Sequence, residues 1–100
     1  MNEVPFKPGD ECYAWLGGPG PDLHVFIVRE IRADGGMVVY DADCIEKDMT
    51  VEPSRISAYK PMRTDIEEQS IRFTFSTESR PEGVYTMRQL LDRAHKKLGI

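Results

Sequence analysis

The chain of 100 residues has few of the residues that usually identify a chemistry or a compartment. It contains one tryptophan, Trp15, and two cysteines, Cys12 and Cys44. Neither cysteine belongs to a Cys-X-X-Cys pair or stands at ligand spacing from a histidine, which argues against a disulfide framework and against a zinc site. We expect both thiols to be free and buried in the core.

Long hydrophobic runs are also absent from the sequence. No stretch of about 18 apolar residues could cross a bilayer, and the N-terminus lacks the basic segment and apolar stretch of a signal peptide. The sequence therefore predicts an intracellular protein, cytoplasmic or nuclear rather than secreted, that does not contact a membrane.

Positive charge is scarce in the first part of the chain. Residues 1–60 hold 11 acidic and 6 basic side chains, whereas residues 61–100 hold 6 acidic and 7 basic ones. An acidic first part suits a basic protein or peptide partner better than it suits nucleic acid. The few basic residues near the C-terminus are explained by the polar face of a helix, so the charge pattern argues against a nucleic-acid ligand.

The sequence also lacks a nucleophile paired with a base. His24 and His95 stand in different parts of the chain, and neither belongs to a local nucleophile motif. We therefore predict that the protein is not an enzyme and has no catalytic residue.

One acidic segment partly fits a calcium-binding loop. Asp41, Asp43 and Glu52 fall on positions one, three and twelve, but Glu46 stands where glycine is needed and Ile45 where an oxygen ligand is expected. The sequence therefore predicts no metal and no cofactor.

What the chain does contain is a series of short alternating segments joined by turns. Alternation of apolar and polar residues predicts strands at about 11–16, 23–32 and 37–41, with two further extended pieces at 49–52 and 56–59. The turn Asp34-Gly35-Gly36 is typical of a hairpin. Five strands in about 55 residues predict a mainly β fold, a five-stranded SH3-like barrel over residues 1–60.

Residues 61–100 are predicted to form a β–α extension of the same compact domain. A polar run over 61–69 reads as a linker, and alternation over 71–75 predicts a strand. The final helix has Thr86 as N-cap, Gln89 three residues later and Gly99 as the stop.

The second strand predicts how the extension packs. Val25-Phe26-Ile27-Val28 is apolar on both faces, although a barrel strand needs only one apolar face. We expect the extension, including the apolar stripe of the final helix, to cover the second face. The alternative is that a partner chain covers it.

Residues 6–60 resemble the Tudor domain. The resemblance rests on Gly9-Asp-Glu-Cys-Tyr-Ala14, on an apolar second strand with Val28 and Ile31, and on Val38-Val-Tyr40 before a turn. Tudor domains bind methylated lysine or arginine in a cage of aromatic rings, which attract a partly dehydrated cation. The resemblance implies that Cys12 and Ala14 lie in the core and that Tyr40 forms a cage wall.

The chain departs from the Tudor pattern at other cage positions. Leu16 occupies the cage position after Ala14, and the aromatic Trp15 stands one place early. His24 occupies the cage position on the second strand, and Asp43 and Ile45 stand after Tyr40 where an aromatic residue and an Asn are usual. Only one cage wall survives this alignment.

A shifted cage remains a candidate site. It would use Tyr13, Trp15 and Tyr40, with Tyr59 as a further wall and Asp41 or Asp43 supplying negative charge. The same rings could instead simply pack the core.

Two functions of different classes follow from this pattern. The favoured one is a non-catalytic module that recognises a basic peptide segment, methylated or not, through Tyr13, Trp15, Tyr40, Asp41 and Asp43. The alternative is a small structural or inhibitory accessory protein, of phage or bacterial type, that docks on a larger protein. An open aromatic pocket would favour the first function, and aromatic rings covered by neighbouring side chains would favour the second. The oligomeric state is left open.

Overall fold

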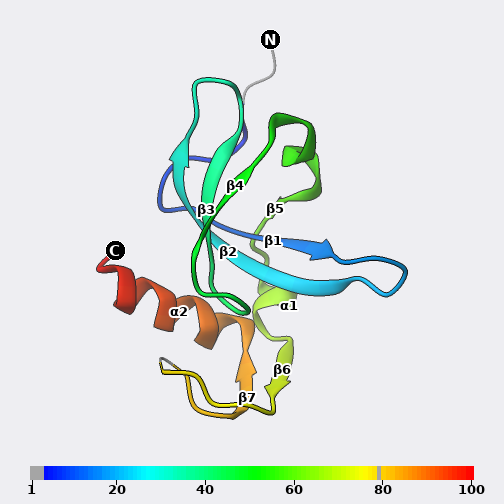
Figure 1. Cartoon of the computed structure of the whole chain (residues 1–100), viewed down its shortest axis with the longest axis vertical. Helices are drawn as coiled ribbons and strands as arrows, with labels where there is room; N and C mark the ends of the chain where they lie inside the picture. Colours follow the sequence, from blue (N-terminus) through cyan, green and yellow to red (C-terminus); the bar gives the residue numbers. More distant parts are fainter. Residues whose placement is uncertain (1–3, 79) are drawn as a thin grey trace.

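The computed structural model describes residues 4–78 and 80–100 and shows a mainly β protein with a C-terminal helix (Figure 1). A five-stranded antiparallel sheet contains β1 (Glu11–Leu16), β2 (Asp22–Ile31), β3 (Met37–Asp41), β4 (Asp48–Val51) and β5 (Lys60–Pro61). The rest of the chain forms the 3₁₀ helix η1 (Pro53–Ala58), the short helix α1 (Thr64–Glu67), a ribbon of β6 (Ser70–Phe73) and β7 (Gly83–Thr86), and α2 (Met87–Leu98).

The strand order of the sheet is β4-β3-β2-β1-β5. The first four strands form a meander of antiparallel neighbours, and β5 returns to pair with the outer side of β1. Within the described part of the chain, β4 and β5 do not pair with each other, so a closed barrel is not found. The predicted mainly β class, the five-stranded antiparallel sheet and the helical C-terminus are confirmed.

The hairpin between β2 and β3 forms at the predicted Asp-Gly-Gly turn. Gly35 has a φ of 90°, a conformation that favours glycine, and the carboxylate of Asp34 accepts a hydrogen bond from the Gly36 amide at 2.9 Å. Gly36 is needed for a different reason, because a Cβ at this position would lie 2.6 Å from the carbonyl oxygen of Val51. Asp34 and Gly35 therefore favour this turn locally, whereas Gly36 is required by the approach of Val51.

Three parts of the expected pattern differ in the structure. The predicted extended piece at 56–59 is instead mostly the end of η1, which Pro53 opens because proline suits the first position of a helix. The predicted linker at 61–69 contains the end of β5 and the helix α1. The loop expected at 78–83 is followed by β7, which pairs with β6 to complete the ribbon.

Two apolar clusters lie on opposite faces of β2. Phe26 and Val28 belong to a cluster enclosed by the curved sheet and η1, whereas Val25 and Ile27 belong to a cluster that lies under α2. The helix contributes four buried side chains to the second cluster, namely Met87, Leu90, Leu91 and Ala94. The prediction that the extension covers the second apolar face of β2 is therefore confirmed.

The ends of α2 are the predicted ones. Thr86 and Gln89 form a reciprocal capping box, and Gly99 ends the helix in the left-handed conformation with a φ of 74°. An ion pair from Arg88 to the carboxylate of Glu11 ties the helix to β1, and Nε2 of His95 lies 2.8 Å from the same carboxylate. No helix in the described residues is long and apolar enough to cross a membrane.

Candidate functional site

The three rings of the predicted cage have different environments. Tyr13 and Tyr40 are only 7% and 5% exposed and belong to the apolar cluster under α2. Trp15, two residues after Tyr13 on the same strand, is 50% exposed. The structure therefore leaves one of the three rings accessible and does not bring the three together around an open pocket.

Two of the candidate rings, Tyr13 and Tyr59, contact other side chains of the protein itself. The guanidinium of Arg63 lies 5.7 Å from the ring centroid of Tyr13, so a cation of the chain itself approaches this ring. Tyr59, the further candidate wall, is buried in the other cluster and packs edge-on against Phe26 at 5.2 Å between centroids. Both rings are therefore covered by other side chains of the protein, as expected if they pack the core.

The carboxylates of the acidic loop point inward. Asp41 is 5% exposed, and its Oδ1 accepts hydrogen bonds from the backbone amides of Asp43 and Cys44 at 3.1 and 2.9 Å. Asp43 is 1% exposed, and its Oδ1 accepts a hydrogen bond from the Val25 amide at 3.1 Å. Both side chains shape the turn after β3 rather than present negative charge to solvent.

Asp43 is also the centre of a buried polar cluster. Its Oδ2 lies 2.9 Å from Nδ1 of His24 on β2, and its carbonyl oxygen accepts a hydrogen bond from Nη1 of Arg80 at 2.6 Å. Burial, reinforced by the nearby carboxylate of Asp41, raises the pKa of Asp43 to about 7. The cluster therefore joins β2, the turn after β3 and the segment that precedes β7.

Three side chains of this cluster have metal-ligating atoms close together. One ligand atom each from His24, Asp41 and Asp43 lies within 4.8 Å of the others. Their oxygens already accept hydrogen bonds from backbone amides, Oδ2 of Asp43 is hydrogen-bonded to Nδ1 of His24, and Arg80 places a positive charge beside Asp43. We therefore interpret the cluster as a buried hydrogen-bond network that holds these segments together.

The two cysteines do not share the predicted burial. Cys12 is fully buried, and burial raises the pKa of its thiol to about 12. The prediction for Cys44 was wrong, because this residue is exposed in the turn after β3. Partial burial and the carboxylates of Asp41 and Asp43 raise the pKa of the Cys44 thiol. A raised pKa disfavours the thiolate, so Cys44 lacks the environment of an activated nucleophile.

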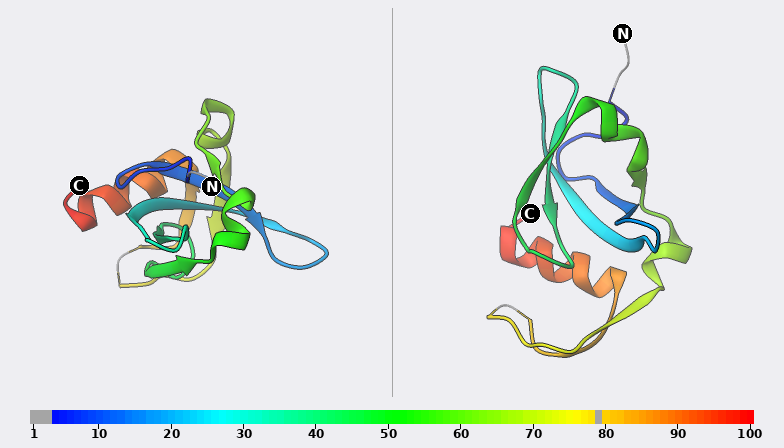
Figure 2. Two further views of the ribbon diagram at one scale, coloured as in Figure 1. Left: turned by 90° about the horizontal axis from the view of Figure 1, so that it is seen from above. Right: turned by 45° about the vertical axis from the view of Figure 1, so that its right-hand side comes forward.

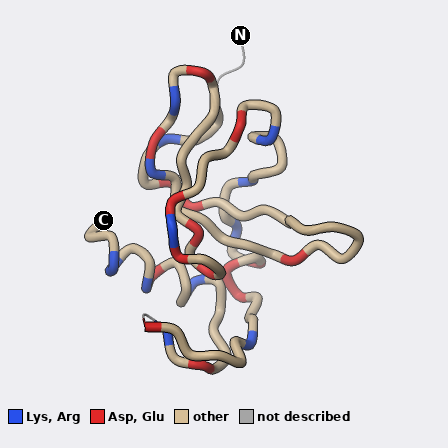
Figure 3. The backbone as a smooth tube through the Cα atoms, in the orientation of Figure 1, with Lys and Arg blue, Asp and Glu red and all other residues tan. Residues whose placement is uncertain are grey.

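The β1–β2 hairpin is the most prominent feature of the surface. It projects away from the remaining elements and from α2, as the views in Figures 1 and 2 show. Trp15 lies near its end, opposite Leu23, and the connecting residues 17–21 are Gly-Gly-Pro-Gly-Pro. Residues 12–21 contain no charged side chain, and Asp22 is the first charge after them (Figure 3).

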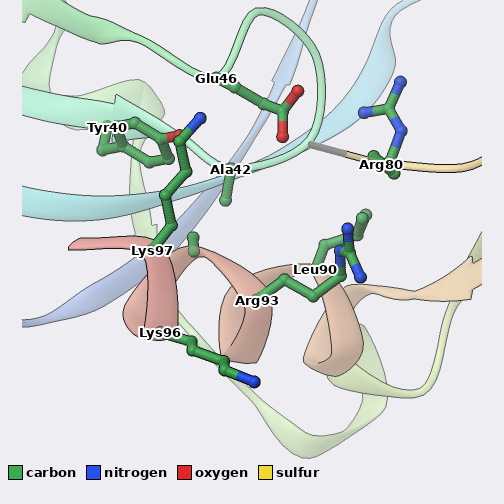
Figure 4. A pocket seen from close by; sticks show the side chains of 9 residues that line it. Tyr40, Ala42, Glu46, Arg80, Leu90, Arg93, Lys96 and Lys97 are labelled. Carbon is green, nitrogen blue, oxygen red and sulfur yellow. The ribbon is translucent and has the colours of Figure 1, made fainter. Parts of the chain in front are cut away.

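A second surface feature is a pocket of about 310 Å³ between α2 and the turn after β3. Its apolar lining comes from Ala42, Leu90 and Ala94, and the ring of Tyr40 forms one wall (Figure 4). Glu46 points into it from the turn after β3, and Lys97 extends from α2 toward Tyr40. No local pattern in the sequence indicates this pocket, because its residues come from three separate segments.

Comparison of the chain with protein-family models, with curated proteins and with solved structures finds no match. The function must therefore be argued from the residues and their geometry.

Proposed function

We propose that this protein is a non-catalytic binding module that docks on a larger protein through the β1–β2 hairpin. The observation that carries the proposal is Trp15, which is 50% exposed although tryptophan buries more apolar area than other side chains. Exposed aromatic residues on a projecting element are typical of binding hot spots, where tryptophan is enriched.

The composition of the hairpin indicates the chemistry of the partner. Because residues 12–21 carry no charge, association at this surface gains little from electrostatic attraction and depends on apolar contact. The partner should offer an apolar pocket large enough for an indole ring. Docking of this kind corresponds to the accessory-protein alternative rather than to recognition of a basic peptide.

Recognition of a methylated side chain is less well supported by the geometry. An aromatic cage needs several accessible rings around one cation, whereas Tyr13 and Tyr40 are buried and the carboxylates of Asp41 and Asp43 bind backbone amides. We expect a trimethylated lysine peptide at millimolar concentration to give no saturable NMR shift at the Trp15 indole. A saturable shift larger than that of the unmodified peptide would restore the cage hypothesis.

A relation to SH3-like and Tudor-like barrels is part of the proposal. It is supported by the meander from β1 to β4, the return of β5 to β1, and the enclosed apolar cluster on the concave side of the sheet. The non-catalytic assignment is supported by the raised pKa of the exposed thiol Cys44.

The docking surface can be tested with a photo-crosslinking amino acid placed at Trp15. The matched control places it at Val84, which is 53% exposed and lies on β7 away from the hairpin. In extracts of its own cells, we expect a discrete adduct from position 15 that position 84 does not give.

Direct binding to the purified partner then measures the contribution of the indole. We expect Trp15→Ala to weaken binding by at least about 2 kcal/mol, roughly 30-fold, and Val84→Ala to change it less than about twofold. Because Trp15 is the only tryptophan, its emission should shift to the blue when the complex forms. Equal affinity of the wild type and Trp15→Ala, or no adduct specific to position 15, contradicts the proposal.

A further inference from the structure

The pocket between α2 and the turn after β3 contains a buried hydroxyl group without a partner. Only 5% of Tyr40 is exposed. Among the described residues, no group forms a hydrogen bond with its hydroxyl oxygen. Buried polar groups in proteins are nearly always paired, because leaving one unpaired costs free energy. A ligand in the pocket that accepts a hydrogen bond would satisfy this group.

Arg80 also belongs to the lining of this pocket and is held firmly in place. Nε of Arg80 is buried and has no hydrogen-bond partner in residues 4–78 and 80–100, although Nη1 of the same side chain binds the carbonyl of Asp43.

The charges around the pocket favour an anion. Among the described residues, the lining includes the acidic Glu46 and the basic Arg80, Arg93, Lys96 and Lys97, although Lys96 points away from the pocket (Figure 4). The guanidinium of Arg80 stacks on Phe73 at 3.5 Å, which holds it in place without neutralising its charge. A concave surface with an excess of one charge concentrates ligands of the opposite charge.

Lys97 is the basic side chain best placed to meet a ligand beside Tyr40. It extends from α2 toward the Tyr40 hydroxyl, whereas Lys96 points away from the pocket (Figure 4). Of the described residues, none forms an ion pair with Lys97. Its ammonium group is therefore available to an anion.

We propose that this pocket binds a small organic phosphate, with the phosphate group between the Tyr40 hydroxyl and the Lys97 ammonium and the apolar body against Leu90 and Ala94. The phosphate group offers three acceptor oxygens and close to two negative charges, which suits donors that converge from separate segments. The pocket volume of about 310 Å³ lies at the lower end of small-molecule sites, which sets the size of the ligand. This site is separate from the β1–β2 hairpin and does not depend on the docking proposal.

Phenyl phosphate is the probe for the first experiment, an NMR titration in phosphate-free buffer. We expect saturable shifts of the Ala42 and Ala94 methyl groups and of the Leu90 methyl groups. Inorganic phosphate should bind more weakly because it lacks the apolar body, and benzoate more weakly because its carboxylate has less charge and fewer oxygens. A short single-stranded oligonucleotide should not produce these localised shifts.

Variants with opposite expected signs test the geometry of the site. Tyr40→Phe and Lys97→Gln should each weaken phenyl phosphate binding about tenfold, because each removes one hydrogen bond to a charged group. Glu46→Gln should strengthen binding, because it removes a negative charge that faces the pocket. Lys60→Gln, an exposed lysine on β5, is the matched control and should bind as the wild type does.

Three results would overturn the proposal. One is shifts that grow linearly with concentration and spread over exposed lysines, which would indicate nonspecific attraction. Another is unchanged affinity in Tyr40→Phe, checked by thermal unfolding to be folded. The third is tighter binding of the oligonucleotide than of phenyl phosphate. Trp15→Ala should leave phenyl phosphate binding unchanged, so failure here and failure of hairpin docking are distinguishable.

Discussion

The unpaired hydroxyl of Tyr40 makes a prediction about stability that is opposite in sign to the usual effect of a core substitution. Tyr40→Phe keeps the ring in its apolar cluster and removes only an oxygen that has no partner in the described chain. An unpaired buried polar group costs about 1–3 kcal/mol. Taking the lower end, we expect Tyr40→Phe to raise the free energy of unfolding by about 1 kcal/mol, which raises Tm by about 4 °C or more in a domain of this size.

Tyr85→Phe is the matched comparison, since it removes the same atom from a hydroxyl that has a partner. The hydroxyl of Tyr85 donates a hydrogen bond to the carbonyl of Pro81 at 2.7 Å. Because this bond is near the surface, its loss should lower the free energy of unfolding by about 0.5 kcal/mol. The two tyrosine variants should therefore move Tm in opposite directions.

The assay is urea and thermal denaturation followed by far-ultraviolet circular dichroism in phosphate-free buffer. Phosphate must be absent because a ligand that binds the folded state stabilises the wild type by mass action. Added phenyl phosphate should then raise Tm more in the wild type than in Tyr40→Phe. A loss of about 1 kcal/mol or more in Tyr40→Phe without ligand would mean that the hydroxyl makes a favourable hydrogen bond in solution, which refutes the reasoning.

Three further predictions concern the fold and its polar contacts. Gly36→Ala should lower the free energy of unfolding by about 1–3 kcal/mol, because the added Cβ would lie 2.6 Å from a backbone oxygen, whereas Gly18→Ala, which has nothing within 4 Å, should be neutral. Glu11→Gln should cost about 1 kcal/mol at neutral pH, because it weakens the ion pair with Arg88 that lowers the pKa of Glu11, and the difference should disappear in acid as Glu11 protonates. Asp43 binds a proton more tightly when folded, with a pKa of about 7 against about 3.9 unfolded, so its contribution to the free energy of unfolding should fall as pH rises from about 4 to 7.

Each of these predictions has a measurement that could contradict it. Equal urea midpoints for the two glycine variants would show that the backbone around Val51 shifts to accommodate the added methyl group without loss of stability. If the Glu11→Gln variant is as stable as the wild type from pH 3 to pH 8, the ion pair between Glu11 and Arg88 does not stabilise the packing of α2 on β1. For Asp43, carboxyl carbon NMR measures the pKa directly, and Asp43→Asn should remove the part of the fall in stability between about pH 4 and pH 7 that Asp43 causes. A titration midpoint near 4 would contradict the effect of burial.

Local signals in the sequence predicted the elements that depend on neighbouring residues. The bounds of β1 and β3 match the predicted segments, because alternation marks a strand with one buried face. The capping box at Thr86 and the glycine at the end of α2 predicted the helix for the same reason, since capping is decided within one turn. By contrast, η1 replaced an expected strand because Pro53 favours a helical first turn, and the short β5 and β7 exist through their pairing with distant partners.

The candidate sites depended much less on local pattern. Alternation places Tyr13 and Trp15 on one face of β1, but it gives no information on how far α2 extends over that face, and this coverage buries one ring and leaves the other half exposed. The same is true of Asp43, whose partners His24 and Arg80 lie 19 and 37 residues away.

The sequence by itself determined the mainly β class, the turn after β2, the capped final helix and the need for a cover on the second face of β2. Only the tertiary structure decided which aromatic residue faces solvent, which carboxylates are used inside the protein, and where an unpaired hydroxyl group borders a pocket. The physical reason is that secondary structure follows from periodicity and backbone hydrogen bonds over a few residues. Burial and charge at a site depend on which distant segments pack together.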